Sequence, residues 1–337
     1  MQDSGSVGSV KEIKTDGSFN RQKNTFTTPF GNQEGELAVE AGRYRLLWSA
    51  VCPWAHRSVI ARSLLGLEEV ISLGTASPMR PRLPHVDWEF SLDKDGVDPV
   101  LGIRYMSEIY LKTAPDYTGR PTVPVIIDIK EQKVVNNDYF KLTNYLETEW
   151  APFHKENAPD LYPEHLRDEI DRLNDVIFHD VNNGVYKCGF AQSQEAYEQA
   201  YDTLFSRLDE LEERLSKQRF LFGDYITDAD IRLYATLVRF DAAYYSAFKA
   251  NRNRIIDFPN LWGYLRDLYQ TPGFGDTTDF DAIKRHYHLS NHISSNDQKS
   301  FHILPKGPDL SGLTSQHNRQ NLSNKPEKFL IKCEKAE

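Results

Sequence analysis

The chain has 337 residues, a length that predicts about two domains. Of these residues 39% are hydrophobic and 12% aromatic, which is enough to form hydrophobic cores and excludes global disorder. Its 40 lysine and arginine residues against 49 aspartate and glutamate residues give a net charge of −9, which argues against nucleic acid or anionic membranes as main partners, because both are bound through clustered basic residues. No apolar run approaches the ~18–20 residues of a membrane span, and the polar N-terminus has no secretory signal, so we expect a cytoplasmic protein.

The first part of the chain predicts an irregular arm followed by a strand, a helix and a strand. Residues 1–42, the N-terminal arm, are rich in Ser, Gly, Asn, Gln and Thr and show no period. A strand is expected over 44–48, and a helix begins after Cys52 and ends at Gly66, a typical C-terminal residue. The run 70–73 predicts the next strand.

A long, proline-interrupted segment over 74–118 comes next, and loops of this length inside a domain are usually functional. Two further strands are expected over 121–128 and 133–135, followed by a helix over 139–147. The order βαβ and then ββα is that of a thioredoxin-like domain. We place this domain at 43–150.

The second half of the chain is predicted to be helical. A linker over 151–163 is rich in proline and polar residues, and the apolar residues of 195–215 follow one helical stripe. No strand pattern interrupts the region before residue 305, so we expect an all-helical domain over 164–305. The composition of 306–337 has few core residues and predicts a flexible tail.

The sharpest functional signal is the string Cys52-Pro53-Trp54-Ala55. A cysteine at a helix N-cap, with proline at the first helical position, faces unpaired backbone N–H groups and the positive end of the helix dipole, and both stabilise a thiolate. Such cysteines have pKa values of roughly 3.5–7.5 instead of ~8.5. Ala55 stands where a dithiol oxidoreductase has its second cysteine, so an external thiol must resolve a mixed disulfide on Cys52. A buried structural cysteine is the alternative, and the strand-turn-helix context favours the reactive one.

The string Thr122-Val123-Pro124 precedes the third strand. The architecture favours a cis bond between Val123 and Pro124, which would direct the Val123 backbone toward an extended peptide ligand. A trans proline at a strand start is the alternative reading.

The remaining cysteines and charge clusters are interpreted as structural. Cys188 is expected to pack in a neutral form and Cys333 to be incidental, because three scattered cysteines form neither a disulfide framework nor a metal cluster. The histidines and basic residues of 284–288 lack partners for a metal site. Thr227 and Asp230 predict a helix capping box rather than a metal site, so we expect no metal cofactor.

Several strings between residues 44 and 308 resemble the xi class of glutathione transferases, the S-glutathionyl-hydroquinone reductases. They are CPWAHR at 52–57, DWEF at 87–90, YTGRPTVP at 117–124, NNGVY at 182–186, LVRFD at 237–241, NLW at 260–262 and IKRHY at 283–287. The resemblance implies a thioredoxin-like N-terminal domain with an all-helical glutathione-transferase C-terminal domain, assembly as a homodimer, and glutathione as co-substrate.

The resemblance also implies roles for individual residues in the thioredoxin-like domain. Cys52 matches the family's catalytic nucleophile, and Trp88 matches the tryptophan that lies against glutathione. Arg120 matches the arginine that binds a glutathione carboxylate. Val123 matches the residue whose backbone pairs with the cysteinyl part of glutathione.

The activity that the resemblance implies is reductive removal of glutathione from S-glutathionyl-hydroquinones through a Cys52–glutathione disulfide. Tyr186 and Tyr287 match the two tyrosines that line the family's aromatic pocket. Since an aryl carbon is a poor leaving group, the ring must first become a ketone, and these hydroxyls are candidates for polarising its oxygen. The alternatives are general thiol transfer, dehydroascorbate-type reduction from the same cysteine, or a non-catalytic interaction module.

One pair of residues departs from the family pattern. Members of the family that the chain resembles usually carry Glu-Ser at this position, and that pair holds the γ-glutamyl end of glutathione. This chain has Asp138-Tyr139 instead. Asp138 keeps the charge with a shorter reach, and Tyr139 puts a ring in place of a small hydroxyl group. The helix N-terminus expected there could still hold a carboxylate. The departure leaves open whether glutathione or another low-molecular-weight thiol is the native partner.

Overall fold

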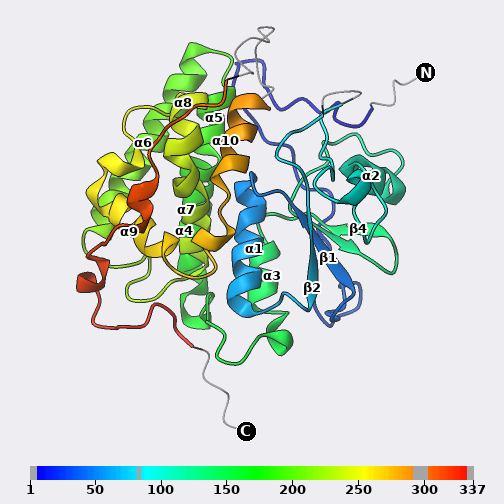
Figure 1. The fold of residues 1–337 in the computed structure, drawn as a ribbon, viewed down its shortest axis with the longest axis horizontal. Helices are drawn as coiled ribbons and strands as arrows, with labels where there is room; N and C mark the ends of the chain where they lie inside the picture. The colour runs from blue at the N-terminus through cyan, green and yellow to red at the C-terminus, as the bar shows by residue number, and fades with distance from the viewer. Residues whose placement is uncertain (1–5, 82–84, 291–302, 332–337) are drawn as a thin grey trace. The chain divides into compact units, whose positions relative to one another are not determined.

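The computed structural model describes residues 6–81, 85–290 and 303–331, which form two compact units (Figure 1). The described residues of the first unit are 6–12, 21–81, 85–154 and 281–290, and those of the second unit are 13–20, 155–280 and 303–331.

A four-stranded mixed sheet lies at the centre of the first unit. Its strands are β1 (Tyr44–Trp48), β2 (Ile71–Thr75), β3 (Val125–Asp128) and β4 (Lys133–Asn136), in the order β2-β1-β3-β4. β2 is parallel to β1, whereas β3 is antiparallel to both β1 and β4. The central strands β1 and β3 are buried along their whole length, because helices cover both faces of the sheet.

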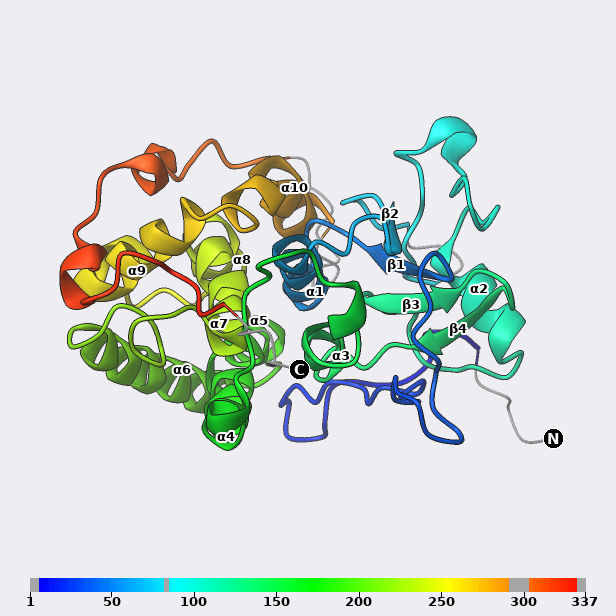
Figure 2. The same cartoon turned by 90° about the horizontal axis from the view of Figure 1, so that it is seen from below.

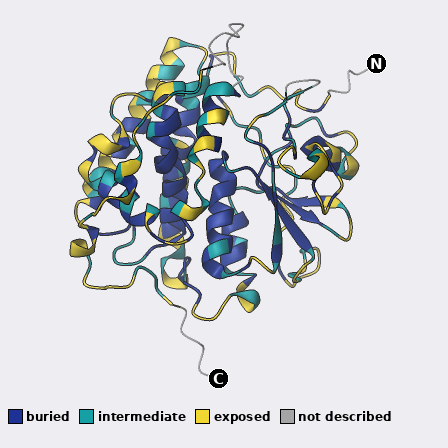
Figure 3. Cartoon of the chain, viewed as in Figure 1, coloured by how far each residue is buried: buried dark blue, intermediate teal, exposed yellow. Residues whose placement is uncertain are grey.

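Helices α1 (Pro53–Leu65) and α3 (Leu142–Glu147) lie on one face of this sheet and α2 (Met106–Thr113) lies on the other (Figure 2). This is the thioredoxin-like arrangement that the order of elements predicted. Every residue of α1 except Ser63 is buried (Figure 3). The helix starts with a proline at its first position and ends at Gly66, whose φ of 73° lies in the left-handed region that favours glycine.

Helix α3 begins three residues later than the sequence predicted. The carboxylate of Asp138 accepts hydrogen bonds from the N–H groups of Phe140 and Lys141, at 3.0 and 3.3 Å. These local bonds hold residues 138–141 in turns before the helix starts.

The second unit is helical, as predicted. Its helices are α4 (Arg167–Ile177), α5 (Gly184–Phe190), α6 (Gln194–Leu215), α7 (Asp228–Arg239), α8 (Tyr245–Ala247) and α9 (Pro259–Tyr269), with π-helical turns at Phe178–Asn182 and Phe240–Tyr244. The predicted stripe of α6 is buried at Ala200, Leu204, Leu208, Leu211 and Leu215. The predicted capping box at Thr227 and Asp230 is also present.

Two segments differ from the sequence prediction. Helix α10 (Phe280–Leu289) falls within the predicted helical domain, yet its residues from Asp281 onward belong to the first unit. In the N-terminal arm, residues 13–20 belong to the second unit, where Phe19 packs edge-on against Phe190 with ring centroids 4.9 Å apart.

The prediction of a flexible tail is corrected for residues 306–331, which pack against the second unit. Arg319 is 2% exposed and donates to the carbonyl oxygens of Leu215 and Arg219, at 2.6 and 2.8 Å. Lys328 forms an ion pair with the buried carboxylate of Asp267 at 2.8 Å. Charged side chains hold this segment in place. Its polar composition therefore predicted a flexible tail although the segment is packed. Cys333 lies outside the described residues.

No described helix combines the length and the apolarity that a membrane crossing requires.

Candidate active site

Four segments of the first unit meet at one end of its sheet. β4 runs in the same direction as β1 and β2, and β3 runs in the opposite direction. The residues that follow β1, β2 and β4, and those that precede β3, therefore share that end. Taken in the strand order β2-β1-β3-β4, these segments contain Arg80 after β2, Cys52 after β1, Val123 before β3 and Asp138 after β4. Three strand spacings make this row roughly 14 Å long.

Cys52 is the N-cap residue of α1, with Pro53 at the first helical position. Its side chain is buried, and its Sγ donates to the carbonyl oxygen of Val123 at 3.4 Å. The structure thus places this thiol at a helix N-terminus, as the sequence predicted. Backbone N–H groups and the helix dipole at such a position favour a thiolate.

Val123 supplies the neighbouring backbone. The bond between Val123 and Pro124 is cis, as the architecture favoured. The carbonyl group of Val123 meets the thiol of Cys52, and within the described part of the chain no acceptor faces its N–H group. That N–H group is therefore available to an extended ligand.

Arg120 is held by the N-terminal arm through both its side chain and its backbone. Its Nη2 lies 3.1 Å from each carboxylate oxygen of Glu12. The side chain of Gln22 accepts from the Arg120 N–H group and donates to the Arg120 carbonyl oxygen, each at 2.9 Å. Burial raises the pKa of Glu12, but Arg120 and the Gln22 N–H group outweigh burial and hold that pKa below its ordinary value. The predicted carboxylate-binding arginine thus already holds a carboxylate of this chain.

Asp138 and Tyr139 lie at the β4 end of the row. The Oδ1 atom of Asp138 accepts from the Asn24 side chain at 3.1 Å in addition to the two N–H groups of its own turn. The Tyr139 ring lies 5.2 Å from the Trp54 ring, and burial raises the pKa of its hydroxyl. The N-terminal arm and α1 thus pack against Asp138 and Tyr139.

The β2–α2 segment, residues 76–105, supplies the other end of the row, where Trp88 is 4% exposed. The Arg80 guanidinium lies 4.3 Å from the Trp88 ring centroid and donates to the carbonyl oxygen of Asp87 at 3.0 Å. Burial and then the Arg120 cation lower the pKa of Arg80 to about 9, so its charge persists at neutral pH. Residues 82–84 and 291–302 aside, no hydrogen-bond partner reaches Arg80 Nη2 or Trp88 Nε1, although both atoms are buried.

The two predicted pocket tyrosines belong to different units. Tyr287 of α10 is 4% exposed and packs edge-on against His286. The His286 ring in turn stacks on the Trp88 ring, with the ring centroids 5.7 Å apart. The structure thus brings Tyr287 into the same unit as Cys52. Tyr186 of α5 belongs to the second unit, in an aromatic cluster with Phe190, Tyr244 and Phe248.

Cys188 also lies in the second unit, where burial raises the pKa of its thiol to about 12. No group of three or more acidic, histidine or cysteine side chains suited to a metal ion occurs among the residues that the structure describes.

Comparison with known proteins decides the family. Residues 51–149 match the glutathione S-transferase N-terminal domain, and residues 194–267 match the C-terminal domain. The chain is 40% identical over 286 residues to the glutathionyl-hydroquinone reductase YqjG of Escherichia coli, with 82% of this chain and 86% of that protein covered. It is 41% identical to the glutathionyl-hydroquinone reductase PcpF of Sphingobium chlorophenolicum, with coverage of 85% and 90%.

Solved structures of glutathione transferases are also similar to this chain. The glutathione transferase Xi of Phanerochaete chrysosporium superposes with a TM-score of 0.83 at 39% identity, covering 91% of this chain and 98% of that one. The glutathione-bound YqjG of Escherichia coli gives a TM-score of 0.77 at 38% identity, with coverage of 92% and 99%. The chain belongs to the Xi class of glutathione transferases.

In this Xi-class chain, sequence reasoning missed the residues that surround the predicted site. Glu12, Gln22 and Asn24 lie in the N-terminal arm, which has no periodic signal, and they reach Arg120 and Asp138 only through tertiary contacts. Arg80 stands in a segment whose length alone suggested function.

Proposed function

We propose that this Xi-class protein is a glutathione-dependent reductase that removes glutathione from S-glutathionyl-hydroquinones, with Cys52 as its nucleophile. The observation that carries the proposal is the thiol at the N-terminus of α1, next to the Val123 backbone, in a chain 40% and 41% identical to two glutathionyl-hydroquinone reductases.

The reaction proceeds through two displacements at sulfur. In the first, the Cys52 thiolate attacks the glutathione sulfur of the ketone form of the substrate, and a disulfide bond forms as the carbon–sulfur bond breaks. The electron pair of that bond becomes an enolate, which takes up a proton to give the hydroquinone. In the second, a glutathione thiolate attacks the mixed disulfide, which yields oxidised glutathione and restores Cys52.

Each further residue of the site has a defined task in this proposal. Trp88 packs against the bound thiol, and the Val123 backbone pairs with its cysteinyl part. Asp138 and Tyr139 hold the γ-glutamyl end. The hydroxyl groups of Tyr186 and Tyr287 donate to the ring oxygen as negative charge develops on it. Assembly as a homodimer in the cytoplasm belongs to the same proposal, and light scattering after size-exclusion chromatography tests the dimer.

Mass spectrometry tests the covalent step. The protein is incubated with a glutathionyl-hydroquinone in the absence of free thiol, and peptides are mapped. One glutathione on Cys52, with one equivalent of hydroquinone released, is expected. Hydroquinone release without this adduct, or an adduct on Cys188 instead, would contradict the mechanism.

A further inference from the structure

We propose that a pocket in the second unit binds a small organic anion, namely a carboxylate with a flat apolar body such as a benzoate. The pocket has a volume of about 230 Å³, and all of its lining residues belong to the second unit. They come from residues 13–19 of the N-terminal arm, from the π-helical turn Phe178–Asn182, and from α5 and α6. None of them has a task in the proposed reductase reaction, so this site is a second one.

One wall of the pocket is a short hairpin of residues 13–19, the arm hairpin. An antiparallel bridge joins Ile13 to Phe19, and the N–H group of Lys14 donates to the carbonyl oxygen of Ser18 at 2.9 Å. Lys14, Ser18 and Phe19 all line the pocket. The arm thus supplies charged, polar and apolar surface to one site.

The arm hairpin is fixed on the start of α6. The N–H group of Gln192 donates to the carbonyl oxygen of Gly17 at 2.8 Å, and the hydroxyl group of Ser193 donates to that of Asp16 at 2.7 Å. Gly17 has a φ of 82°, and a Cβ atom there would lie 2.8 Å from the Ser193 nitrogen. Only glycine allows this approach, and the wall of the pocket is therefore held in place before a ligand binds.

The charge of the lining favours an anion. Lys14 and Lys187 line the pocket, and no carboxylate forms an ion pair with either of them among the residues that the structure describes. Lys187 donates one N–H group to the carbonyl oxygen of His179 at 3.0 Å, which leaves two donors on its ammonium group. Asp180 is the one carboxylate of the described lining, and Arg207 holds it through Nε and Nη2, each at 3.0 Å. The pocket thus keeps two unneutralised cations in a chain whose net charge is −9.

The apolar part of the lining and the volume define the body of the ligand. Ala196 and Ala200 are four residues apart and share one face of α6, and the buried Phe19 ring lines the same pocket. Two methyl groups and a ring form a shallow apolar surface that suits a flat ring. A volume of 230 Å³ corresponds to about eight water molecules at ~30 Å³ each, which is room for roughly ten non-hydrogen atoms. Glutathione and its aromatic conjugates are too large, whereas a benzoate has the required size and charge.

The backbone beside the pocket carries a second indication of function. His179 and Asp180 belong to a π-helical turn, a rare geometry that occurs frequently at functional sites. Phe19 packs against Phe190 at 4.9 Å, and Phe190 packs against Tyr186 at 5.5 Å. The pocket therefore adjoins the aromatic cluster of Tyr186 without including it.

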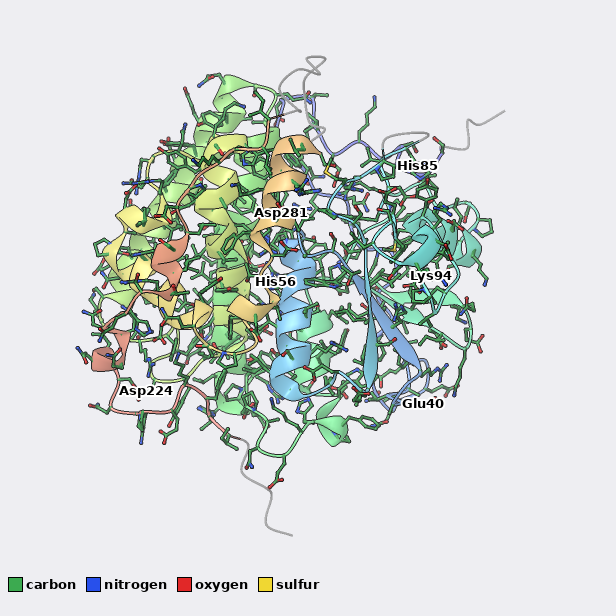
Figure 4. The ribbon with its side chains drawn as sticks, in the orientation of Figure 1. Glu40, His56, His85, Lys94, Asp224 and Asp281 are labelled. Carbon is green, nitrogen blue, oxygen red and sulfur yellow. The ribbon has the colours of Figure 1, made fainter. Side chains whose placement is uncertain are left out.

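Fluorine NMR titration with 4-fluorobenzoate tests the site. Lys14→Met and Lys187→Met each remove one cation, and Ala196→Leu fills the apolar part of the pocket. Lys94→Met is the matched control, because it removes an exposed lysine of the β2–α2 segment in the first unit (Figure 4). The neutral analogue 4-fluorobenzamide reports binding without the charge, and thermal melting checks that each variant folds.

The parent protein is expected to bind 4-fluorobenzoate saturably, with a Kd of roughly 0.1–10 mM for a ligand of this size. Lys14→Met and Lys187→Met should each weaken binding about tenfold, the low end for a lost charged hydrogen bond, because both side chains are partly exposed. Ala196→Leu should abolish binding, and Lys94→Met should leave the Kd within about twofold. The benzamide should bind at least about tenfold more weakly than the benzoate, since it lacks the charge.

Three results overturn the inference. The first is a parent protein that shows no saturable binding of 4-fluorobenzoate. The second is equal affinity for the benzoate and the benzamide, which would show that the lysines recognise no anion. The third is unchanged binding in Lys14→Met, Lys187→Met and Ala196→Leu, which would place the benzoate elsewhere, for example in the aromatic pocket of the reductase. Each result leaves the proposed reductase standing, because the transfer of glutathione to Cys52 is measured separately.

Discussion

The Sγ atom of Cys52 lies 3.4 Å from the carbonyl oxygen of Val123 and donates a hydrogen bond to it. A thiol can make this bond and a thiolate cannot, so deprotonation exchanges it for the N–H groups and dipole of α1. The same carbonyl group therefore stabilises the resting thiol and marks where the reacting sulfur lies. The balance between these two states makes Cys52 the first residue to test.

Cys52→Ser is expected to lower reductase turnover by at least about 10³-fold, as removal of a covalent nucleophile does in other enzymes. The fold should persist, because a serine hydroxyl group can donate to the Val123 carbonyl oxygen in the same way. Initial rates of hydroquinone release, with thermal melting of the same samples, provide the measurement. Cys188→Ala is the matched control and should keep its rate within about twofold. Loss of turnover in that control would make Cys188 a resolving thiol.

Alkylation should distinguish the two described cysteines directly. Burial raises the pKa of Cys188 to about 12, so at pH 7 only about 10⁻⁵ of this thiol is ionised. Iodoacetamide at pH 7 is therefore expected to label Cys52 well before Cys188. Peptide mass spectrometry over time measures both rates, and addition of urea should make Cys188 reactive. Equal labelling of both cysteines in the folded protein would contradict the raised pKa of Cys188 and the assignment of Cys52 as the reactive thiol.

Removing the hydroxyl group of Tyr186 or Tyr287 should slow the reduction of glutathionyl-hydroquinones more than the reduction of simple mixed disulfides. Tyr186→Phe or Tyr287→Phe removes a hydroxyl group from a buried ring without changing its packing. Glutathionyl-hydroquinone reduction is expected to slow about 10- to 100-fold, the range for one lost donor or acid. Reduction of a simple mixed disulfide should slow less than about threefold, because its thiolate leaving group needs no help. Equal losses on both substrates would favour general thiol transfer as the activity.

The sequence predicted the elements that local patterns encode. The strand β1 begins and ends where its aromatic and aliphatic run does, and α1 ends at Gly66 because a left-handed C-cap favours glycine. Cys52 and Pro53 lie at the N-terminus of that helix, as their identities require.

What the sequence could not predict depends on contacts between distant residues. Glu12 and Arg120 are 108 positions apart, and neither belongs to a periodic element. The prediction of a flexible tail was wrong because it also depended on distant contacts. Arg319 binds carbonyl groups more than 95 positions away, and the composition of the segment does not encode such an interaction.

The ion pair between Glu12 and Arg120 predicts a pH dependence of stability. The folded-state pKa of Glu12 lies below its ordinary value of 4.5, so its contribution is present above pH 4.5 and is lost as pH falls through the folded-state value. Glu12→Gln is expected to lower the free energy of unfolding by about 1 kcal/mol at pH 7, because the pair is only partly exposed. The difference from wild type should shrink below pH 4.5. Urea unfolding at several pH values measures it, with the exposed Glu34→Gln as control.

The identity of the thiol can be tested at Asp138 and Tyr139. The Oδ1 atom of Asp138 already accepts from Asn24, Phe140 and Lys141, so the carboxylate is fixed in place. A positioned charge needs little improvement, and we therefore expect Asp138→Glu with Tyr139→Ser to change the glutathione KM less than about threefold.

Asp138→Asn is the matched variant for this test. The amide oxygen can still accept from the two N–H groups of the turn, so stability should change little, while the charge that faces the γ-glutamyl amine is lost. The glutathione KM is then expected to rise about 10- to 100-fold with an unaltered melting temperature. Steady-state kinetics on one glutathionyl-hydroquinone compares the three proteins. A wild-type KM in the millimolar range that falls at least tenfold in the double variant would point to another low-molecular-weight thiol, because the family pair would then be restoring a glutathione site that this chain has lost.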